Sequence, residues 1–293
     1  LAVSAEAQQG TAPANSGPIE KGQRIFTCAH SFHMFAPAIV ADLAQKAGIE
    51  NHVQLGMSTI GGSPIIRHWD IPEESNKAKE ALRTGKVDVL TLSPMYLPDA
   101  GIENFVRLAL EHNQDIRIVI QPIWLVYEVY EPTTKRPKTV DRNALTGAEL
   151  RARHEPHFKK MDEFISEMNR KLGKTVICEV PAAQAIIALR EKIIAGEAPG
   201  LETQEDLFTD AIGHGKPPLQ ALVGYCNFAV IYRRNPIGLP APEILKKAKL
   251  GDQEEALNRL LQELAWSAVT EHPLSGLGHV SKLEAVGSSP VTK

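Results

Sequence analysis

A serine lies between two histidines just after the first apolar run of this chain. The apolar run is Arg24–Cys28, and the residues that follow it are Ala29, His30, Ser31, Phe32 and His33. A serine hydroxyl becomes a nucleophile when a nearby base removes its proton, and histidine titrates in the range that this needs. A serine directly before a helix is also a common N-cap. The sequence therefore leaves two interpretations of Ser31, a nucleophile or a helix cap.

An acid and a base for such a nucleophile occur together late in the chain. Asp210 and His214 are four positions apart and precede an apolar helical pattern. A catalytic histidine needs a partner that fixes its tautomer, usually a carboxylate on the other ring nitrogen. We therefore predict Ser31 as nucleophile, His214 as base and Asp210 as the orienting acid. If Asp210 points away, a Ser–His dyad remains.

The elements expected to position these residues alternate between strands and helices. Five short runs rich in Val and Ile are expected to be strands buried on both faces, namely Arg24–Cys28, Val53–Leu55, Val87–Leu92, Ile116–Trp124 and Thr175–Val180. The helices expected are Phe35–Ala47, Pro72–Thr84, Ile102–His112, Gly147–Leu172, Ala182–Ala195, Pro218–Tyr232 and Gln253–Ala268. This alternation predicts a three-layer α/β/α fold around a parallel sheet of about five strands. Ligands bind such sheets at the carboxyl ends of the strands.

Three further clusters fall at or near expected strand ends. Gly62 belongs to a Gly-Gly turn after the second strand, and Ser93 follows the third. His68 and Trp69 come a little after the Gly-Gly turn. The backbone N–H of Gly62 is a candidate to stabilise an oxyanion beside that of Ser31. For His68 and Trp69, a wall of the substrate pocket and a place in the core are both open.

These blocks resemble those of the SGNH (GDSL-like) hydrolase superfamily, and in particular its divergent bacterial esterase branch. The resemblance extends from about Arg24 to Leu239. It implies the flavodoxin-like SGNH fold, with Ser31 as nucleophile, Gly62 as an oxyanion donor and His214 as the base.

The chain departs from the family pattern at three places. His30 stands where the family has Asp or Asn, and the late block is Asp-x-x-x-His instead of Asp-x-x-His. The segment Ser93–Gly101 lacks the Gly-x-Asn that supplies an asparagine donor. Ser93, or a backbone N–H of its loop, is the expected replacement, with His30 in reserve.

By this resemblance the protein is expected to be a serine hydrolase that cleaves an ester, such as the acyl (acetyl) ester of a carbohydrate, through an acyl-enzyme and without a cofactor. The alternative is a non-hydrolytic carbohydrate-binding protein on the same fold. His30, His33, Asp210 and His214 also suggest zinc ligands. Their spacing is a weak signal, and no metal is expected.

The composition excludes some classes of function. The chain has 293 residues, of which 43% are hydrophobic and 23% charged, and a formal net charge of -3. The charge argues against nucleic-acid binding, and no apolar run approaches the length of a membrane span. Three cysteines without a C-x-x-C pair do not form a disulfide framework. His154 and His157, on a long polar helix, are expected to be exposed.

The chain is expected to form one SGNH-like domain over residues 22–270. Residues 1–21 are expected to be a disordered leader, and residues 271–293 a C-terminal tail. The first seven residues, LAVSAEA, resemble the end of a secretory signal and favour a secreted or periplasmic protein. A disordered end of a cytoplasmic protein is the alternative. The oligomeric state does not follow from the sequence.

Overall fold

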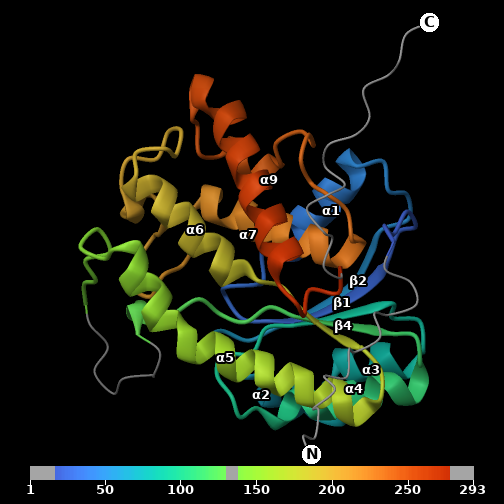
Figure 1. The fold of residues 1–293 in the computed structure, drawn as a ribbon. Helices are drawn as coiled ribbons and strands as arrows, with labels where there is room; N and C mark the ends of the chain where they lie inside the picture. Colours follow the sequence, from blue (N-terminus) through green and yellow to red (C-terminus); the bar gives the residue numbers. More distant parts are fainter. Residues whose placement is uncertain (1–16, 130–137, 278–293) are drawn as a thin grey trace, which may run out of the picture.

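A parallel five-stranded sheet forms the centre of the computed structural model, which describes residues 17–129 and 138–277 (Figure 1). The strands lie in the order β2-β1-β3-β4-β5, which is the flavodoxin-like order. Their bounds are β1 Arg24–Ala29, β2 Val53–Thr59, β3 Val89–Leu92, β4 Arg117–Ile120 and β5 Ile177–Glu179. All four pairings are parallel, so the carboxyl ends of the strands share one edge.

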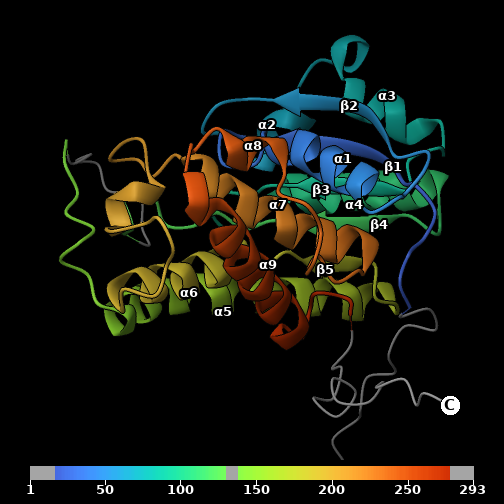
Figure 2. The same ribbon diagram turned by 90° about the horizontal axis from the view of Figure 1, so that it is seen from above.

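Helices cover both faces of this sheet, and the fold is the expected three-layer α/β/α arrangement (Figures 1 and 2). One layer contains α1 Ala36–Lys46, α6 Ala182–Ile194, α7 Pro217–Tyr232, α8 Glu243–Lys246 and α9 Glu254–Glu271. The other contains α2 Ile65–Trp69, α3 Lys77–Arg83, α4 Ala100–His112 and α5 Gly147–Leu172. Short 3₁₀ turns occur at η1 Glu73–Ser75, η2 Val126–Glu128, η3 Gln204–Leu207 and η4 Gly251–Gln253.

The strand pleat divides the apolar core between the two layers. Ile25 pairs with Val89, and both side chains pack against the layer that contains α7. The next pair, Phe26 and Leu90, points to the layer that contains α4 and α5. Successive side chains of a strand point to opposite faces. Continuous apolar runs in β1 and β3 therefore fill both cores.

The edge strand β2 does not follow the expectation of burial on both faces. Val53, Leu55 and Met57 are each more than 40% exposed, and they alternate with less exposed residues. Alternate side chains of a strand point to opposite faces, and this edge strand is less covered than the central strands. Among the described helices, none is long and apolar enough to span a bilayer.

Two further expectations need correction. His154 and His157 are buried, because α5 turns this part of its surface toward the protein. Within the expected leader, residues 1–16 lie outside the described residues, but Ile19 donates its N–H to the carbonyl of Tyr232 at the end of α7. The expected C-terminal tail, from residue 271, starts where α9 ends at Glu271. Residues 130–137 and 278–293 lie outside the described residues.

Candidate active site

Ser31 lies in the turn that joins β1 to α1, at the carboxyl edge of the sheet. The N-cap of α1 is Phe35, and no side chain caps this helix. The helix-cap interpretation of Ser31 is therefore wrong. Its Oγ lies 2.9 Å from Nε2 of His214, within hydrogen-bond range.

The loop before α7 holds the acid and the base together. A bridge between Phe208 and Gly215 closes this loop, and Thr209 donates its N–H to the carbonyl of His214 at 2.8 Å. Asp210 accepts through Oδ2 from Nδ1 of His214 at 2.6 Å, and through Oδ1 from the backbone N–H of Gly213 at 2.9 Å. The closed loop thus brings the Asp210 carboxylate to the His214 ring across a four-residue spacing.

These contacts determine the charge of Asp210 and the tautomer of His214. Burial alone raises the pKa of Asp210, but the hydrogen bonds from His214 and from backbone N–H groups outweigh it, and the pKa is lowered. Asp210 is thus an anion at neutral pH. Because an anion only accepts, the proton in its bond with His214 belongs to Nδ1. Nε2 is then free to accept the Ser31 proton.

Aromatic residues pack against one side of the His214 imidazole. The ring of Phe32 meets His214 edge to face at 5.2 Å and stacks on Trp124 at 4.4 Å. Trp124 donates Nε1–H to the carbonyl of Gly213 at 2.8 Å. Gln121 at the end of β4 donates to the carbonyl of Phe32 at 3.1 Å. The β1 turn and the loop of the base are thereby tied to β4.

A buried charged cluster supports the same loop from beneath. The carboxylate of Glu128 accepts from Arg142 at 2.9 Å and from Arg190 at 2.9 and 3.0 Å, and all three side chains are nearly inaccessible to solvent. Arg142 also donates to the carbonyl of Ala211, next to Asp210, at 3.0 Å. Its guanidinium lies over the ring of Phe208. Removing one partner of a buried ion pair strongly destabilises a protein, because the other charge stays buried without compensation. Through the bond from Arg142 to Ala211, this cluster holds the loop in place.

A cavity of about 440 Å³ opens beside the Ser31 hydroxyl. Most of its wall is apolar, and its charge-bearing groups are limited to imidazoles. Its lining residues are His30, Ser31, Phe32, Gly61, Gly62, Met95, Tyr96, Ile123, Val126, Tyr127, Val129, Ile212 and His214. Tyr127 has a left-handed backbone (φ 55°), and so does Glu128 (φ 60°). Two such residues in succession are unfavourable, and the ion pairs of Glu128 hold this wall in place.

The two backbone donors expected for an oxyanion have no other partner. In the described part of the chain, the N–H groups of Ser31 and Gly62 donate to no protein acceptor, and both residues line the cavity. The expected third donor is placed elsewhere. Ser93 is fully buried outside the cavity lining, and its Oγ lies 3.0 Å from Nε2 of His30. Nδ1 of His30 accepts from the N–H of Phe32 at 3.2 Å.

His30 is therefore occupied at both ring nitrogens, although it contributes to the cavity wall. Burial and the neighbouring His68 lower its pKa to about 4, so its ring is neutral at neutral pH. A neutral ring that accepts at Nδ1 carries its proton on Nε2 and donates it to Ser93. His30 thus has no free donor, and the Ser93 hydroxyl, which keeps its own proton, lies outside the cavity lining and so is not placed to donate to an oxyanion there.

His68 and Trp69 belong to the core, not to the pocket. His68 is fully buried, and its two nitrogens bond to the hydroxyls of Ser58 at 2.8 Å and Ser63 at 3.1 Å. Trp69 packs edge to face on Phe105 of α4. Neither residue lines the cavity. Of the two alternatives left open for this pair, the structure favours the place in the core, because the short helix α2 directs His68 inward and packs Trp69 on α4.

Sequence reasoning missed the residues that brace the triad. Trp124 was expected only as the end of a strand, although an indole at a strand's carboxyl edge is itself a signal. Glu128, Arg142 and Arg190 are far apart in sequence. No local pattern indicates that three distant charges meet.

The comparisons with known proteins show the fold and nothing finer. No protein-family model matches the chain. No curated protein matches it in sequence. Among solved structures, it is similar to the crystal structure of a DUF4886 family protein from Bacteroides uniformis ATCC 8492, with a TM-score of 0.57 and 13% identity. The match covers 86% of this chain and 95% of that chain, so it extends over nearly the whole α/β/α arrangement.

Proposed function

We propose that this protein is a serine esterase of the SGNH type, which cleaves a carboxylic ester through an acyl-enzyme. The observation that carries the proposal is the continuous hydrogen-bonded series from Ser31 Oγ through His214 to Asp210, with distances of 2.9 and 2.6 Å, beside an open cavity. Nucleophile, base and orienting acid lie in the geometry that activates a serine. They lie at the edge of the sheet where such folds bind ligands.

The reaction follows from these positions. His214 Nε2 takes the Ser31 proton while Oγ bonds to the ester carbonyl carbon. The carbonyl oxygen becomes an oxyanion, which the N–H groups of Ser31 and Gly62 stabilise. Collapse expels the alcohol, which takes the proton from His214, and leaves an acyl group on Ser31. Water then attacks with the same base, releases the carboxylic acid and restores the hydroxyl.

The cavity favours recognition of the acyl half of the ester. Its wall includes Ile123, Val126, Val129 and Ile212, which offer an acyl chain apolar contact. The substrate class that we propose is therefore a neutral ester, and a carbohydrate acyl ester belongs to it when the sugar extends into solvent. The proposed extracytoplasmic setting depends on residues 1–7, which lie outside the described residues.

A fluorophosphonate probe tests the proposal directly. The wild-type chain is expected to react covalently at Ser31 and to lose all hydrolysis of p-nitrophenyl butyrate in proportion to labelling. Ser31→Ala and His214→Ala are expected to resist the probe, whereas His112→Ala, an exposed histidine on α4, reacts like the wild type. Absence of labelling in the folded wild-type protein contradicts the proposal.

One observation favours the alternative of a non-hydrolytic carbohydrate-binding protein. Two backbone donors without a side-chain donor form a weaker oxyanion hole than the family pattern provides. If the probe does not label the protein, calorimetry with acylated oligosaccharides tests this alternative. Binding to the wild type that is lost in Ile212→Trp, which fills the cavity, supports it.

A further inference from the structure

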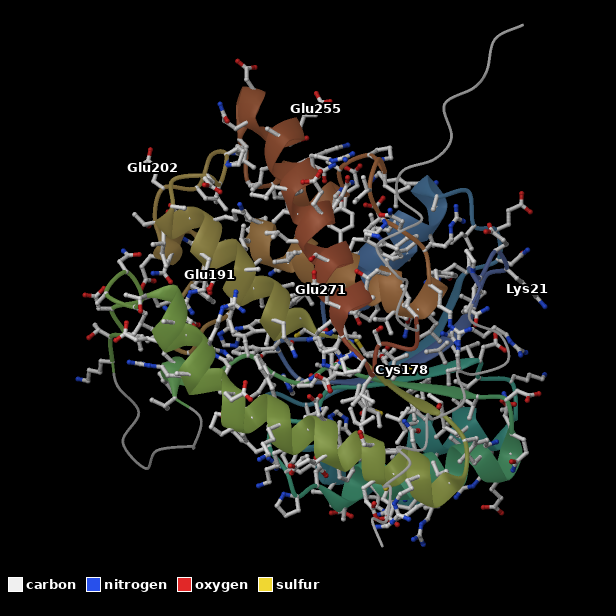
Figure 3. The ribbon with its side chains drawn as sticks, viewed as in Figure 1. Lys21, Cys178, Glu191, Glu202, Glu255 and Glu271 are labelled. Atoms are coloured by element: carbon white, nitrogen blue, oxygen red, sulfur yellow. The ribbon has the colours of Figure 1, made fainter. Side chains whose placement is uncertain are left out.

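A second cluster of ionisable side chains lies where α5, β5 and the end of α9 meet. Asp162 comes from α5, Glu179 is the last residue of β5, and His272 directly follows α9. One ligand atom of each residue lies within 4.8 Å of the others. Figure 3 labels Cys178 on β5 and Glu271 at the end of α9, the immediate neighbours of two of these residues. None of the three takes part in the proposed ester hydrolysis.

Glu179 is the unusual member of this cluster. Its side chain is completely buried, and neither carboxylate oxygen has a hydrogen-bond partner among the described residues. Oδ1 of Asp162 is likewise buried and without a partner. A buried carboxylate is unfavourable unless a donor or a cation compensates it.

The distances in the cluster match those of a metal coordination shell better than those of hydrogen bonds. Nε2 of His272 lies 3.4 Å from Oδ1 of Asp162 and 3.6 Å from Oε1 of Glu179. Hydrogen bonds between such atoms are shorter, about 2.7 to 3.2 Å. Ligands bound to a tetrahedral ion at about 2.0 to 2.2 Å lie about 3.3 to 3.6 Å from one another.

We propose that Asp162, Glu179 and His272 bind one divalent transition-metal ion, with Zn²⁺ as the best fit. One imidazole and two carboxylates form a mixed nitrogen and oxygen set, which suits Zn²⁺ better than Ca²⁺ or Mg²⁺, whose ligands are oxygens. The three protein ligands leave a fourth position on the side of the surface groove.

The surface around the cluster allows an ion to enter. A groove reaches Asp162 and His272, and its rim carries more acidic than basic side chains. Its two basic side chains already have acidic neighbours, since Arg151 bonds to Glu191 and Lys159 lies 3.9 Å from Glu163. The residues that line the groove are Arg151, Glu155, Phe158, Lys159, Asp162, Glu163, Gln184, Ala268, Glu271, His272 and Pro273.

Ion binding has a consequence for the turn after α9. Leu274 donates its N–H to Nδ1 of His272 at 3.3 Å, which places the ring proton on Nε2. A metal at Nε2 moves this proton to Nδ1, so the contact with the Leu274 N–H must open. The carbonyl of Leu274 remains bonded to the N–H of Glu179 at 2.8 Å. The Leu274 amide is therefore a local reporter of the ion.

Thermal unfolding of the full chain, after dialysis against a chelator, tests the site. Addition of ZnCl₂ at about a hundred times its Kd is expected to raise Tm by roughly 4–8 °C. Calorimetry is expected to show one Zn²⁺ per chain, and CaCl₂ at the same concentration is expected to have little effect. CoCl₂ is expected to give the visible absorption of a four-coordinate ion.

Glu179→Gln and His272→Ala are expected to lose the Zn²⁺-dependent rise in Tm and the Co²⁺ absorption. Glu163→Gln is the matched control, because Glu163 lies beside Asp162 on α5 and lines the same groove. It is expected to respond like the wild type, with a shifted Leu274 amide resonance on Zn²⁺ addition. His214→Ala is expected to respond likewise, which excludes zinc bound at the proposed triad.

The amide of Glu179→Gln has the size of the carboxyl group and no charge, so this variant is expected to fold at least as stably in chelator. If it does not fold, His272→Ala decides, since His272 lies after the last turn of α9. An unchanged Zn²⁺ response in either folded variant, or no response in the wild type, overturns the proposal. Glu179 is then a protonated carboxyl group that shares its proton with Asp162.

Discussion

Two regions of this protein place a histidine beside carboxylates, and the distances within them differ. At the sheet edge, His214 lies 2.6 Å from Asp210 and 2.9 Å from Ser31, and these side chains are partly exposed. At the α5–β5–α9 junction, His272 lies 3.4 and 3.6 Å from its two carboxylates, one of which is fully buried. The first set of distances allows proton transfer, and the second leaves room for an ion.

The partners of each imidazole explain this difference. Asp210 has backbone donors and His214 as partners, so its charge is stabilised without an added ion. Neither oxygen of Glu179 makes a hydrogen bond within the described residues, and the interaction with the Gln184 side chain does not offset its burial. We thus propose general-base chemistry for these residue types in one place and metal binding in the other. The difference between the two sites is whether the protein itself supplies hydrogen-bond donors to the carboxylate.

The largest effect that tests this comparison is expected at Ser31 and His214. Ser31→Ala and His214→Ala are each expected to lower kcat for p-nitrophenyl butyrate on the order of 10⁴-fold or more, because each removes a reacting atom. The double variant is expected to be scarcely worse than either single one, since the two act as a unit. Steady-state kinetics with His112→Ala as control measures this. Retention of most activity in either single variant contradicts the assignment.

Asp210→Asn is expected to have the next largest effect. The amide keeps the size of the side chain but donates toward Nδ1, so His214 adopts the wrong tautomer. We expect kcat to fall roughly 10²- to 10⁴-fold while KM changes little. A variant that keeps kcat and raises KM would show that Asp210 serves binding and that Ser31 and His214 act as a dyad.

The third effect concerns stability and separates buried from exposed ion pairs. Arg142→Ala is expected to lower the free energy of unfolding by about 3–5 kcal/mol, because Glu128 loses a buried partner and the carbonyl of Ala211 loses a donor. Arg151→Ala, which removes an exposed pair with Glu191, is expected to cost about 1 kcal/mol or less. Urea unfolding monitored by circular dichroism gives both values. Equal losses would mean that the buried cluster does not brace the loop.

The fourth effect uses a histidine that no carboxylate holds by a hydrogen bond. His154 donates from Nδ1 to Leu150 and accepts the Leu125 N–H at Nε2, so only its neutral form fits. Burial lowers its pKa to about 4. The unfolded chain, with an ordinary pKa near 6.5, therefore binds more protons between these values, and stability is lost as pH falls through this window.

His154→Gln is accordingly expected to lessen the loss of stability between pH 7 and pH 4.5 by about 2–3 kcal/mol. Urea unfolding at the two pH values, compared with the wild type, measures the difference. The same pH dependence in variant and wild type would show that His154 is protonated without cost in the folded protein.

The sequence allowed prediction of the sheet, of most of the helices and of the proximity of Ser31, Asp210 and His214. Alternating apolar runs specify parallel strands, and reactive side chains after strand ends specify the edge where they meet. It did not allow prediction of α2, whose five residues are too few for a helical period, and so the choice between core and pocket wall for His68 and Trp69 stayed open. The Glu128 cluster and the Glu179 cluster depend on contacts between distant segments. Side-chain pairing across tertiary contacts has no local signature.

The smallest effect is expected at Ser93, where the sequence argument and the structure disagree. A role as third oxyanion donor predicts a ten- to thousandfold fall in turnover for Ser93→Ala. In the structure, however, the Ser93 hydroxyl bonds to His30 at 3.0 Å and lies outside the cavity lining. We therefore expect kcat to fall less than about threefold, and the free energy of unfolding to fall by about 1 kcal/mol through the lost hydrogen bond. Kinetics and urea unfolding on the same preparation separate the two outcomes. A tenfold or larger fall in kcat with unchanged KM would return Ser93 to the oxyanion hole, and it would mean that His30 releases the hydroxyl when substrate binds.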